Sequence, residues 1–174
     1  MGFSKKQLVE LCGAIAVAAS LFFVGLQLYL DRKVALAEQY FNRAESAKAD
    51  RRSLLESEAY FQDIEESWAL GWRPFYWNEE LLISKQIETG ERSVVAVMAR
   101  ALNLRLNIIG YDSLYYQYQQ GLLDDESWTH LRASLKIRMA NDEFAMTIFE
   151  NHARATLQPV IDELLRELEA ENSL

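Results

Sequence analysis

A run of apolar residues near the N-terminus constrains this chain more than any other feature. Between Leu11 and Leu26 the sequence contains no charged residue, and apolar side chains predominate from Leu8 to Leu30. As a helix, Leu8 to Leu30 is roughly 34 Å long, which is enough to cross a hydrocarbon layer of about 30 Å. We therefore predict one N-terminal transmembrane helix and assign residues 1–33 to a membrane anchor that contacts the lipid bilayer.

A secretory signal peptide is the alternative interpretation of this run, with Lys5 and Lys6 as its basic start. The run is longer than the apolar part of a usual signal peptide. The residues from Leu28 to Lys33 contain no pair of small residues suited to cleavage, and they continue directly into a helical pattern. These features favour an anchor that is retained.

Basic residues on the two sides of the predicted span indicate its orientation. Lys5, Lys6 and the α-amino group precede the span, whereas Arg32 and Lys33 begin a more basic stretch after it. The side richer in Lys and Arg normally stays in the cytoplasm. We therefore expect a single-pass protein whose domain after the span is cytoplasmic.

Small residues recur along the predicted span. Ala14 and Ala18 are four residues apart, as are Ala16 and Ser20, and this spacing lets helix backbones approach closely. Alanine is also an ordinary residue of membrane helices. Glu10 lies near the start of the span, where its carboxylate either stays among the lipid headgroups or pairs with a partner helix. We predict that these five positions bind a partner.

The rest of the chain, residues 34–174, is predicted to form one small helical bundle, so the fold class is all-α. The whole chain has only 7 Gly and 2 Pro, and no segment shows sustained strand alternation. Thr89 is the expected N-cap of the longest bundle helix, Gly121 its terminating glycine, and Asp124 or Asp125 the next cap. Periodicity predicts helices over about 34–57, the first part of 59–77, 78–88, 91–120, 126–140, 141–154 and 160–169.

The bundle is strongly acidic. The net charge of the chain is −8, and the first thirty residues contribute +1, so the remainder carries −9. Nucleic-acid binding depends on neutralising phosphates with Lys and Arg, so we do not expect nucleic acid as a partner. The only cysteine, Cys12, lies in the predicted span, which excludes an intrachain disulfide and a cysteine-rich zinc site.

Aromatic residues crowd into ten positions in the middle of the chain, around the helix breakers Gly71 and Pro74. This segment is either a loop whose rings plug into the core or a patch that touches the bilayer interface or a partner protein. We name it as a second candidate surface for partner binding. Its residues are Trp68, Trp72, Phe75, Tyr76 and Trp77.

Nothing in the sequence predicts a catalytic, cofactor or metal site. His130 and His152 lack the Glu-x-x-His spacing of di-iron bundles, and Glu126 with His130 suits a surface pair. Neither a Gly-x-Ser-x-Gly motif nor a glycine-rich phosphate loop is present. We therefore expect a protein that is not an enzyme. A polar cluster buried in a cleft around either histidine would favour an enzyme instead.

Four residues of the long predicted helix share one face: Tyr111, Leu114, Tyr115 and Tyr118. Their spacing of three, four and seven residues is that of a helical stripe. The stripe either packs into the core or lines a groove for a ligand or partner, with tyrosine hydroxyls at its wall.

The segment from Tyr115 to Trp128 has the pattern YxQYxxGLLDxxxW, with Gly121 and Asp124 at its turn. Together with the N-terminal span and the closing stretch Leu157 to Leu168, this pattern resembles a family of uncharacterised bacterial single-span membrane proteins with a helical domain. The resemblance covers most of the chain and weakens between Ser57 and Glu88. It implies the fold and a bacterial origin, and it implies no activity or catalytic residue.

These observations favour a non-enzymatic accessory or scaffold subunit of a bacterial inner-membrane assembly. Its partner would be another membrane protein or further copies of the same chain, contacted through the span and the helical domain. The alternative is a membrane-anchored sensor or small-ligand binding module that uses the tyrosine stripe as its pocket. A filled bundle without a cavity at the stripe would exclude this alternative.

Overall fold

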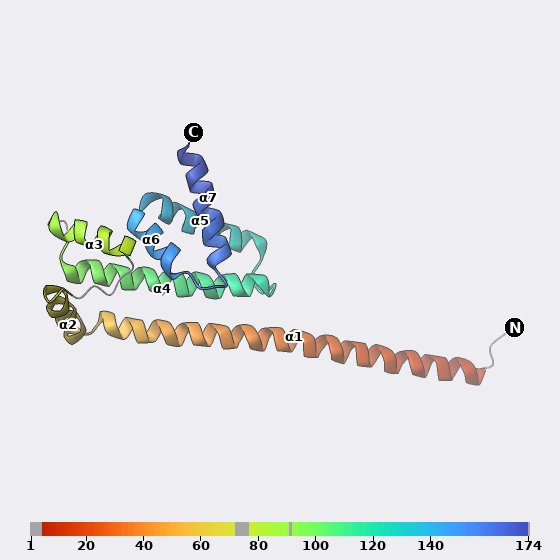
Figure 1. The fold of residues 1–174 in the computed structure, drawn as a ribbon. Helices are drawn as coiled ribbons and strands as arrows, with labels where there is room; N and C mark the ends of the chain where they lie inside the picture. The colour runs from red at the N-terminus through yellow and green to blue at the C-terminus, as the bar shows by residue number, and fades with distance from the viewer. Residues whose placement is uncertain (1–4, 72–76, 91, 174) are drawn as a thin grey trace. The chain divides into compact units, whose positions relative to one another are not determined.

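The computed structural model describes residues 5–71, 77–90 and 92–173, and every regular element in this part of the chain is an α-helix (Figure 1). The predicted all-α fold is therefore confirmed, with a long apolar N-terminal helix followed by a small bundle. The helices are α1 (Lys5–Leu55), α2 (Glu58–Ala69), α3 (Trp77–Glu88), α4 (Val94–Gln119), α5 (Asp125–Asn141), α6 (Glu143–His152) and α7 (Gln158–Asn172).

The chain divides into two compact units, and the boundary lies between Gln39 and Tyr40. Because this boundary falls inside α1, the helix contributes to both units. In the first unit, the apolar side chains of α1 between Leu8 and Leu30 are exposed; Leu21, Phe22 and Phe23 each expose between 62% and 69% of their surface. Two described helices, α1 and α4, are long and apolar enough to cross a membrane. For α1, a membrane span and a signal sequence both satisfy this test.

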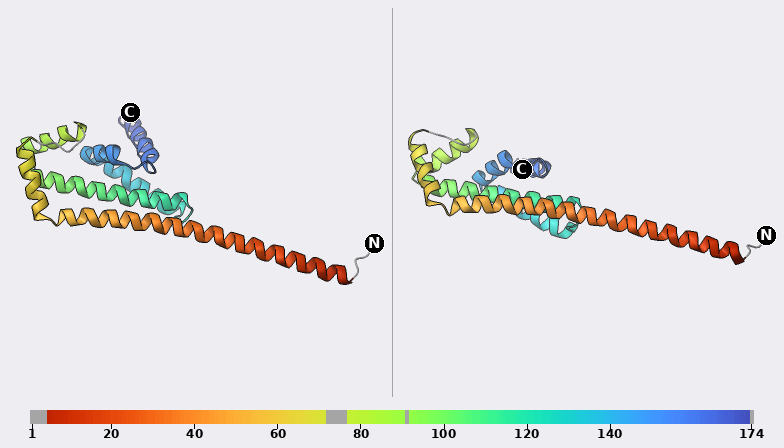
Figure 2. Two further views of the ribbon diagram at one scale, coloured as in Figure 1. Left: turned by 60° about the horizontal axis from the view of Figure 1, so that its bottom comes forward. Right: turned by 90° about the horizontal axis from the view of Figure 1, so that it is seen from below.

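In the second unit, α4 and α6 form the centre of the bundle. α4 contacts α2, α3, α5 and α6, and α6 also contacts α3, α5 and α7. Both views of Figure 2 show α2 lying across the start of α4. The apolar residues of α4 are shared among these neighbours, so α4 is a core helix of the bundle. The largest fully buried side chains of the core include Ile83, Ile108, Leu135, Ile148, Phe149 and Ile161.

Side-chain caps explain where four of the helices begin. Each capping oxygen accepts a hydrogen bond from the backbone N–H three residues later, which satisfies a donor that the helix start leaves open. The predicted cap Asp124 is among them. The caps are Ser57 for α2, Ser93 for α4, Asp124 for α5 and Asp142 for α6.

The predicted start of the longest bundle helix is wrong. Its cap is Ser93, whose hydroxyl accepts from Ala96 N–H at 3.2 Å, and the predicted cap Thr89 instead donates its hydroxyl to the Lys85 carbonyl at 2.8 Å. The reason is that Gly90, with φ of +70°, belongs to the end of α3. Thr89 therefore lies before the glycine that ends α3, and it belongs to the end of α3 and not to the start of α4. The predicted first residue, Glu91, lies outside the described residues.

The turn between α4 and α5 confirms the predicted glycine stop. Gly121 has φ of +71°, a conformation that glycine adopts without strain. Its N–H donates to the Tyr118 carbonyl, and the N–H of Leu122 donates to the Gln117 carbonyl. These two bonds satisfy carbonyls that the end of α4 would otherwise leave open, as in a Schellman motif.

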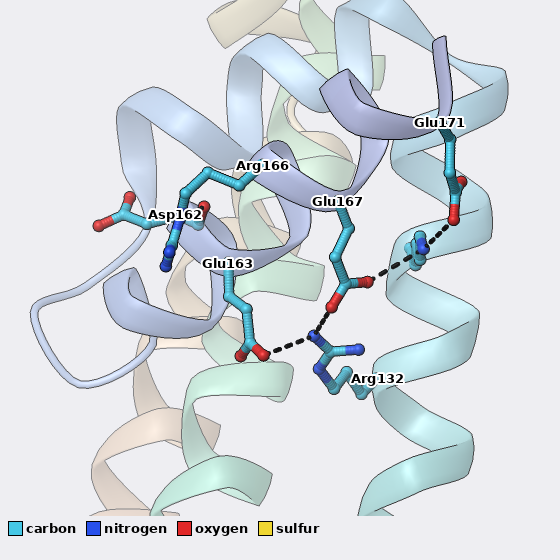
Figure 3. A network of polar contacts seen from close by, with 7 residues as sticks. Arg132, Asp162, Glu163, Arg166, Glu167 and Glu171 are labelled. Carbon is cyan, nitrogen blue, oxygen red and sulfur yellow. Dashed lines mark hydrogen bonds and ion pairs between the residues drawn. The ribbon is translucent and has the colours of Figure 1, made fainter. Parts of the chain in front are cut away.

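Ion pairs join α5 to α7 along the surface of the bundle (Figure 3). Arg132 of α5 contacts Glu167 at 2.5 Å and Glu163 at 3.2 Å, and Lys136 contacts Glu167 at 3.0 Å and Glu171 at 2.6 Å. Glu167 therefore receives two cations, and hydrogen bonds from Arg132 first and Lys136 second lower the pKa of its carboxyl. The network is only partly shielded from water, which limits its contribution to stability.

Candidate functional site

The five partner-binding positions predicted in α1 all lie exposed on the first unit. Successive residues of an α-helix are rotated by about 100°, so Glu10, Ala14 and Ala18 share one face. Ala16 and Ser20 lie on the opposite side of the helix, where the Ser20 hydroxyl donates to the Ala16 carbonyl at 2.9 Å. The helix thus divides the predicted surface into two separate faces, and only one of them carries the carboxylate.

Most of the predicted aromatic patch lies outside the described residues: this holds for Trp72, Phe75 and Tyr76, and for the side chain of Trp77, which begins α3. Trp68 of α2 is partly buried and packs against the bundle core. For Trp68, the structure therefore matches the interpretation as a core ring.

The tyrosine stripe of α4 is divided between core packing and a groove. Tyr115 and Tyr118 pack against Trp128 of α5, with ring centroids 4.8 Å and 5.4 Å from the indole. Tyr111 contacts Phe149 edge-on, at 6.1 Å between ring centroids. Leu114 and Tyr111 also line a groove, so the bundle is not filled along the whole stripe.

This groove has a volume of about 280 Å³ and combines apolar and cationic walls. Leu106, Leu114 and Leu131 provide apolar surface. Lys48, Arg52 and Arg138 provide positive charge, and Lys48 is paired with Glu45 at 2.7 Å. We call it the cationic groove. Such a combination suits a ligand with an apolar body and an anionic group.

A second group of polar residues surrounds a carboxylate that is completely buried. Glu79 of α3 accepts a hydrogen bond from the Asn151 amide at 2.9 Å, and its Oε1 lies 2.8 Å from Nε2 of His152. Arg105 of α4 approaches the same carboxylate at 3.5 Å. His130, by contrast, is exposed on α5. No local pattern in the sequence distinguishes the two histidines in this way.

Polar groups cluster around His152, but the adjoining cavity of about 60 Å³ is far smaller than the ~300–1,000 Å³ of a usual ligand or substrate pocket. The His152 ring contacts two groups through the same nitrogen. Nε2 lies 2.8 Å from Glu79 and 3.0 Å from Nη2 of Arg105. A ring nitrogen donates when it is protonated and accepts when it is not, so it bonds either the carboxylate or the guanidinium, but not both at once. Within the described residues, no three His, Cys, Asp or Glu side chains converge as a metal site would require.

A second buried carboxylate, Asp112, connects three parts of the bundle. Its Oδ2 accepts a hydrogen bond from the Tyr40 hydroxyl at 2.5 Å and lies 3.6 Å from the Arg154 guanidinium. The ring of Tyr40 stacks on Tyr116 at 4.2 Å. Burial raises the pKa of the Asp112 carboxyl, although the hydrogen bond from Tyr40 opposes this. Burial and the Asp112 contact raise the pKa of the Tyr40 hydroxyl.

Between these two carboxylates lies a small cavity of about 60 Å³, which we call the arginine cavity. It brings together side chains from α1, α4, α6 and the loop after α6. Three of the residues that line it are arginines and two are isoleucines. The lining residues are Arg51, Arg105, Ile108, Ile109, His152 and Arg154.

The arginine cavity was not predicted from the sequence, although the residue pattern of α4 contains one indication of it. Arg105, Ile108, Ile109 and Asp112 follow the spacing of one helical face, and charged residues at both ends of an otherwise apolar stripe are unusual. The cavity also needs Arg51 and Arg154, which lie far from α4 in the sequence. Residue spacing within one helix does not indicate that they meet.

Comparisons with protein-family models, with curated proteins and with solved structures return no match for this chain.

Proposed function

We propose that this protein is a non-enzymatic accessory or scaffold subunit of a bacterial inner-membrane assembly. The single observation that carries the proposal is the exposed apolar segment of α1 in the first unit, from Leu8 to Leu30. Apolar side chains cover all sides of this helix, which suits lipid or a partner helix and does not suit water. The basic residues after the span support a cytoplasmic position for the bundle.

Within the span, the face of Glu10, Ala14 and Ala18 is the proposed docking surface. Small residues permit close backbone approach, and a carboxylate near lipid is stabilised by a polar partner. The partner is either another membrane protein or a second copy of this chain. The resemblance of the α4–α5 turn to an uncharacterised bacterial membrane-protein family remains a prediction and agrees with this role.

The test is native gel electrophoresis of gently solubilised membranes, with identification of co-purifying proteins. We expect the chain in a complex larger than its own 20.1 kDa plus detergent. Replacing both Ala14 and Ala18 with Leu should dissociate the complex, whereas Ala16→Leu, on the opposite side of the helix, should leave it intact. A monomer with nothing attached would contradict the proposal, as would recovery of the chain in the soluble fraction.

A second candidate function, a small-ligand binding module, is favoured by the cationic groove beside the tyrosine stripe. Octanoate combines a short apolar chain with one negative charge, so it is a suitable probe. It should raise the thermal midpoint of the wild-type chain and act much less on a variant carrying Arg52→Gln and Arg138→Gln. An equal response of both proteins would remove this candidate.

A further inference from the structure

The charges around the arginine cavity are not balanced by the carboxylates that contact it. Three guanidinium groups line the cavity, from Arg51, Arg105 and Arg154. Two buried carboxylates flank it, Glu79 beside Arg105 and Asp112 beside Arg154. Arginine keeps its charge at any ordinary pH, so these five groups leave one positive charge uncompensated even when both carboxylates are ionised.

Within the part of the chain that the structure describes, Arg51 is the cation that lacks a carboxylate. Among the described residues its contact is to a backbone oxygen, the Arg105 carbonyl, at 3.4 Å, and no ion pair joins it to an acidic side chain. Burial is the main cause that lowers the pKa of its guanidinium, and the neighbouring charges of Arg105 and Arg154 add to this effect. Like charges that converge in a partly buried site are unfavourable unless an anion joins them.

The size of the cavity limits what this anion can be. A water molecule requires roughly 10–15 Å³ of such space, so about 60 Å³ has room for a few waters or for one ion of a few heavy atoms. Guanidinium groups present planar pairs of N–H donors that match the oxygens of phosphate. Ile108 and Ile109 are part of the lining, and beside such buried side chains charge-assisted hydrogen bonds are screened less than in water.

We propose that the arginine cavity binds a phosphate group, held by Arg51 together with Arg105 and Arg154. The group is either free phosphate or the end of a phosphomonoester such as phosphatidic acid. Arg154 is partly exposed, so its side of the cavity is the route by which the anion enters. The proposal does not depend on a membrane partner, because every residue that lines the cavity belongs to the second unit.

The experiment uses the full chain, purified in a phosphate-free maltoside detergent. Inorganic phosphate is titrated at constant ionic strength, with binding measured by calorimetry and by the thermal midpoint. We expect saturable binding in the wild type. Arg51→Gln should weaken it by about 10- to 100-fold, the usual effect of losing a hydrogen bond to a charged group. Arg43→Gln is the matched control, since it removes the same charge from an exposed residue of the same helix that lines neither the arginine cavity nor the cationic groove.

A loss of binding caused by misfolding is recognised from the variant without ligand. Arg51→Gln removes a cation that other cations repel, so its midpoint without phosphate should equal or exceed that of the wild type. Arg154→Gln, at a more exposed position, provides a second variant that should also weaken binding.

A second arm distinguishes the source of the phosphate group. The chain is placed in phosphatidylcholine nanodiscs with and without phosphatidic acid, in the absence of inorganic phosphate. Stabilisation by phosphatidic acid that depends on Arg51, without a response to inorganic phosphate, identifies a lipid as the source; the reverse pattern identifies the free anion. The proposal is overturned if neither probe stabilises the chain, if chloride has the same effect, or if Arg43→Gln weakens binding as much as Arg51→Gln.

Discussion

Removing the Tyr40 hydroxyl is the sharpest test of how the end of α1 is held to the bundle. Tyr40→Phe keeps the ring that stacks on Tyr116 and removes the donor that contacts Asp112 at 2.5 Å. A hydrogen bond to a charged group contributes about 1.5–3 kcal/mol to stability. For a bundle of this size the thermal midpoint should fall by about 5–10 °C at neutral pH.

The pH dependence of this loss follows from the state of Asp112. Burial raises the pKa of this carboxyl in the folded state, and removing the Tyr40 donor raises it further. A folded-state pKa above the unfolded value of 3.8 means that the folded chain gains stability as pH falls through that pKa. The difference between wild type and Tyr40→Phe should therefore shrink at acidic pH, towards the roughly 0.5–1.5 kcal/mol of a neutral hydrogen bond.

The assay is urea unfolding of the full chain in detergent at neutral and acidic pH, followed by tryptophan fluorescence. Tyr116→Phe is the matched control, because it also loses one hydroxyl from the stacked pair, and among the described residues that hydroxyl has no hydrogen bond in the structure. A double-mutant cycle with Asp112→Asn isolates the pairwise interaction. Equal small effects of the two tyrosine variants, or a loss that stays constant with pH, would refute the reasoning.

Three further predictions concern helix ends and the surface network. Glu167→Gln should cost at most about 1 kcal/mol in a urea titration, and high salt should reduce this cost. Because the carboxyl has a lowered pKa in the folded chain, the stabilisation is fully present above its ordinary pKa of 4.5 and is lost as the pH falls from there through the lowered pKa. Gly121→Ala should destabilise the chain by about 1 kcal/mol, because Gly121 has a positive φ. Gly110→Ala, inside α4, should stabilise the chain by up to about 1 kcal/mol. Thermal midpoints of the two variants that move in the same direction would contradict this. Asp142→Ala, which removes the α6 cap and an ion pair with Arg100, should cost about 1–3 kcal/mol by thermal unfolding, and an unchanged midpoint would count against the cap.

Local signals in the sequence were sufficient for much of the fold. The glycine stop at Gly121 and the cap at Asp124 were predictable because each depends on a few neighbouring residues. The cap at Thr89 was wrong because two residues with similar capping ability, Thr89 and Ser93, lie on opposite sides of Gly90. Recognising that Gly90 ends the preceding helix would have assigned the cap to Ser93.

The arginine cavity was beyond this kind of prediction for a different reason. Its carboxylates and cations come from elements far apart in the chain, as the Tyr40–Asp112 and Glu79–His152 contacts illustrate. Helical periodicity specifies which residues share a face, but it does not specify which two faces meet. The side chains that periodicity does not pair correctly are therefore those whose partners lie far away in the sequence.

The contact of the Tyr40–Leu55 segment with the bundle has a consequence for local unfolding. Its described contacts include a small buried alanine, Ala44, and the polar groups of Tyr40 and Arg51. The Tyr40 ring also stacks on Tyr116, so separating this surface exposes some apolar area, but less than unfolding the core does, and it should contribute less to the heat capacity of unfolding. Amide hydrogen exchange in this segment should therefore respond to salt and pH at conditions where the core around Phe149 does not, which makes the segment a separate cooperative unit within a continuous helix.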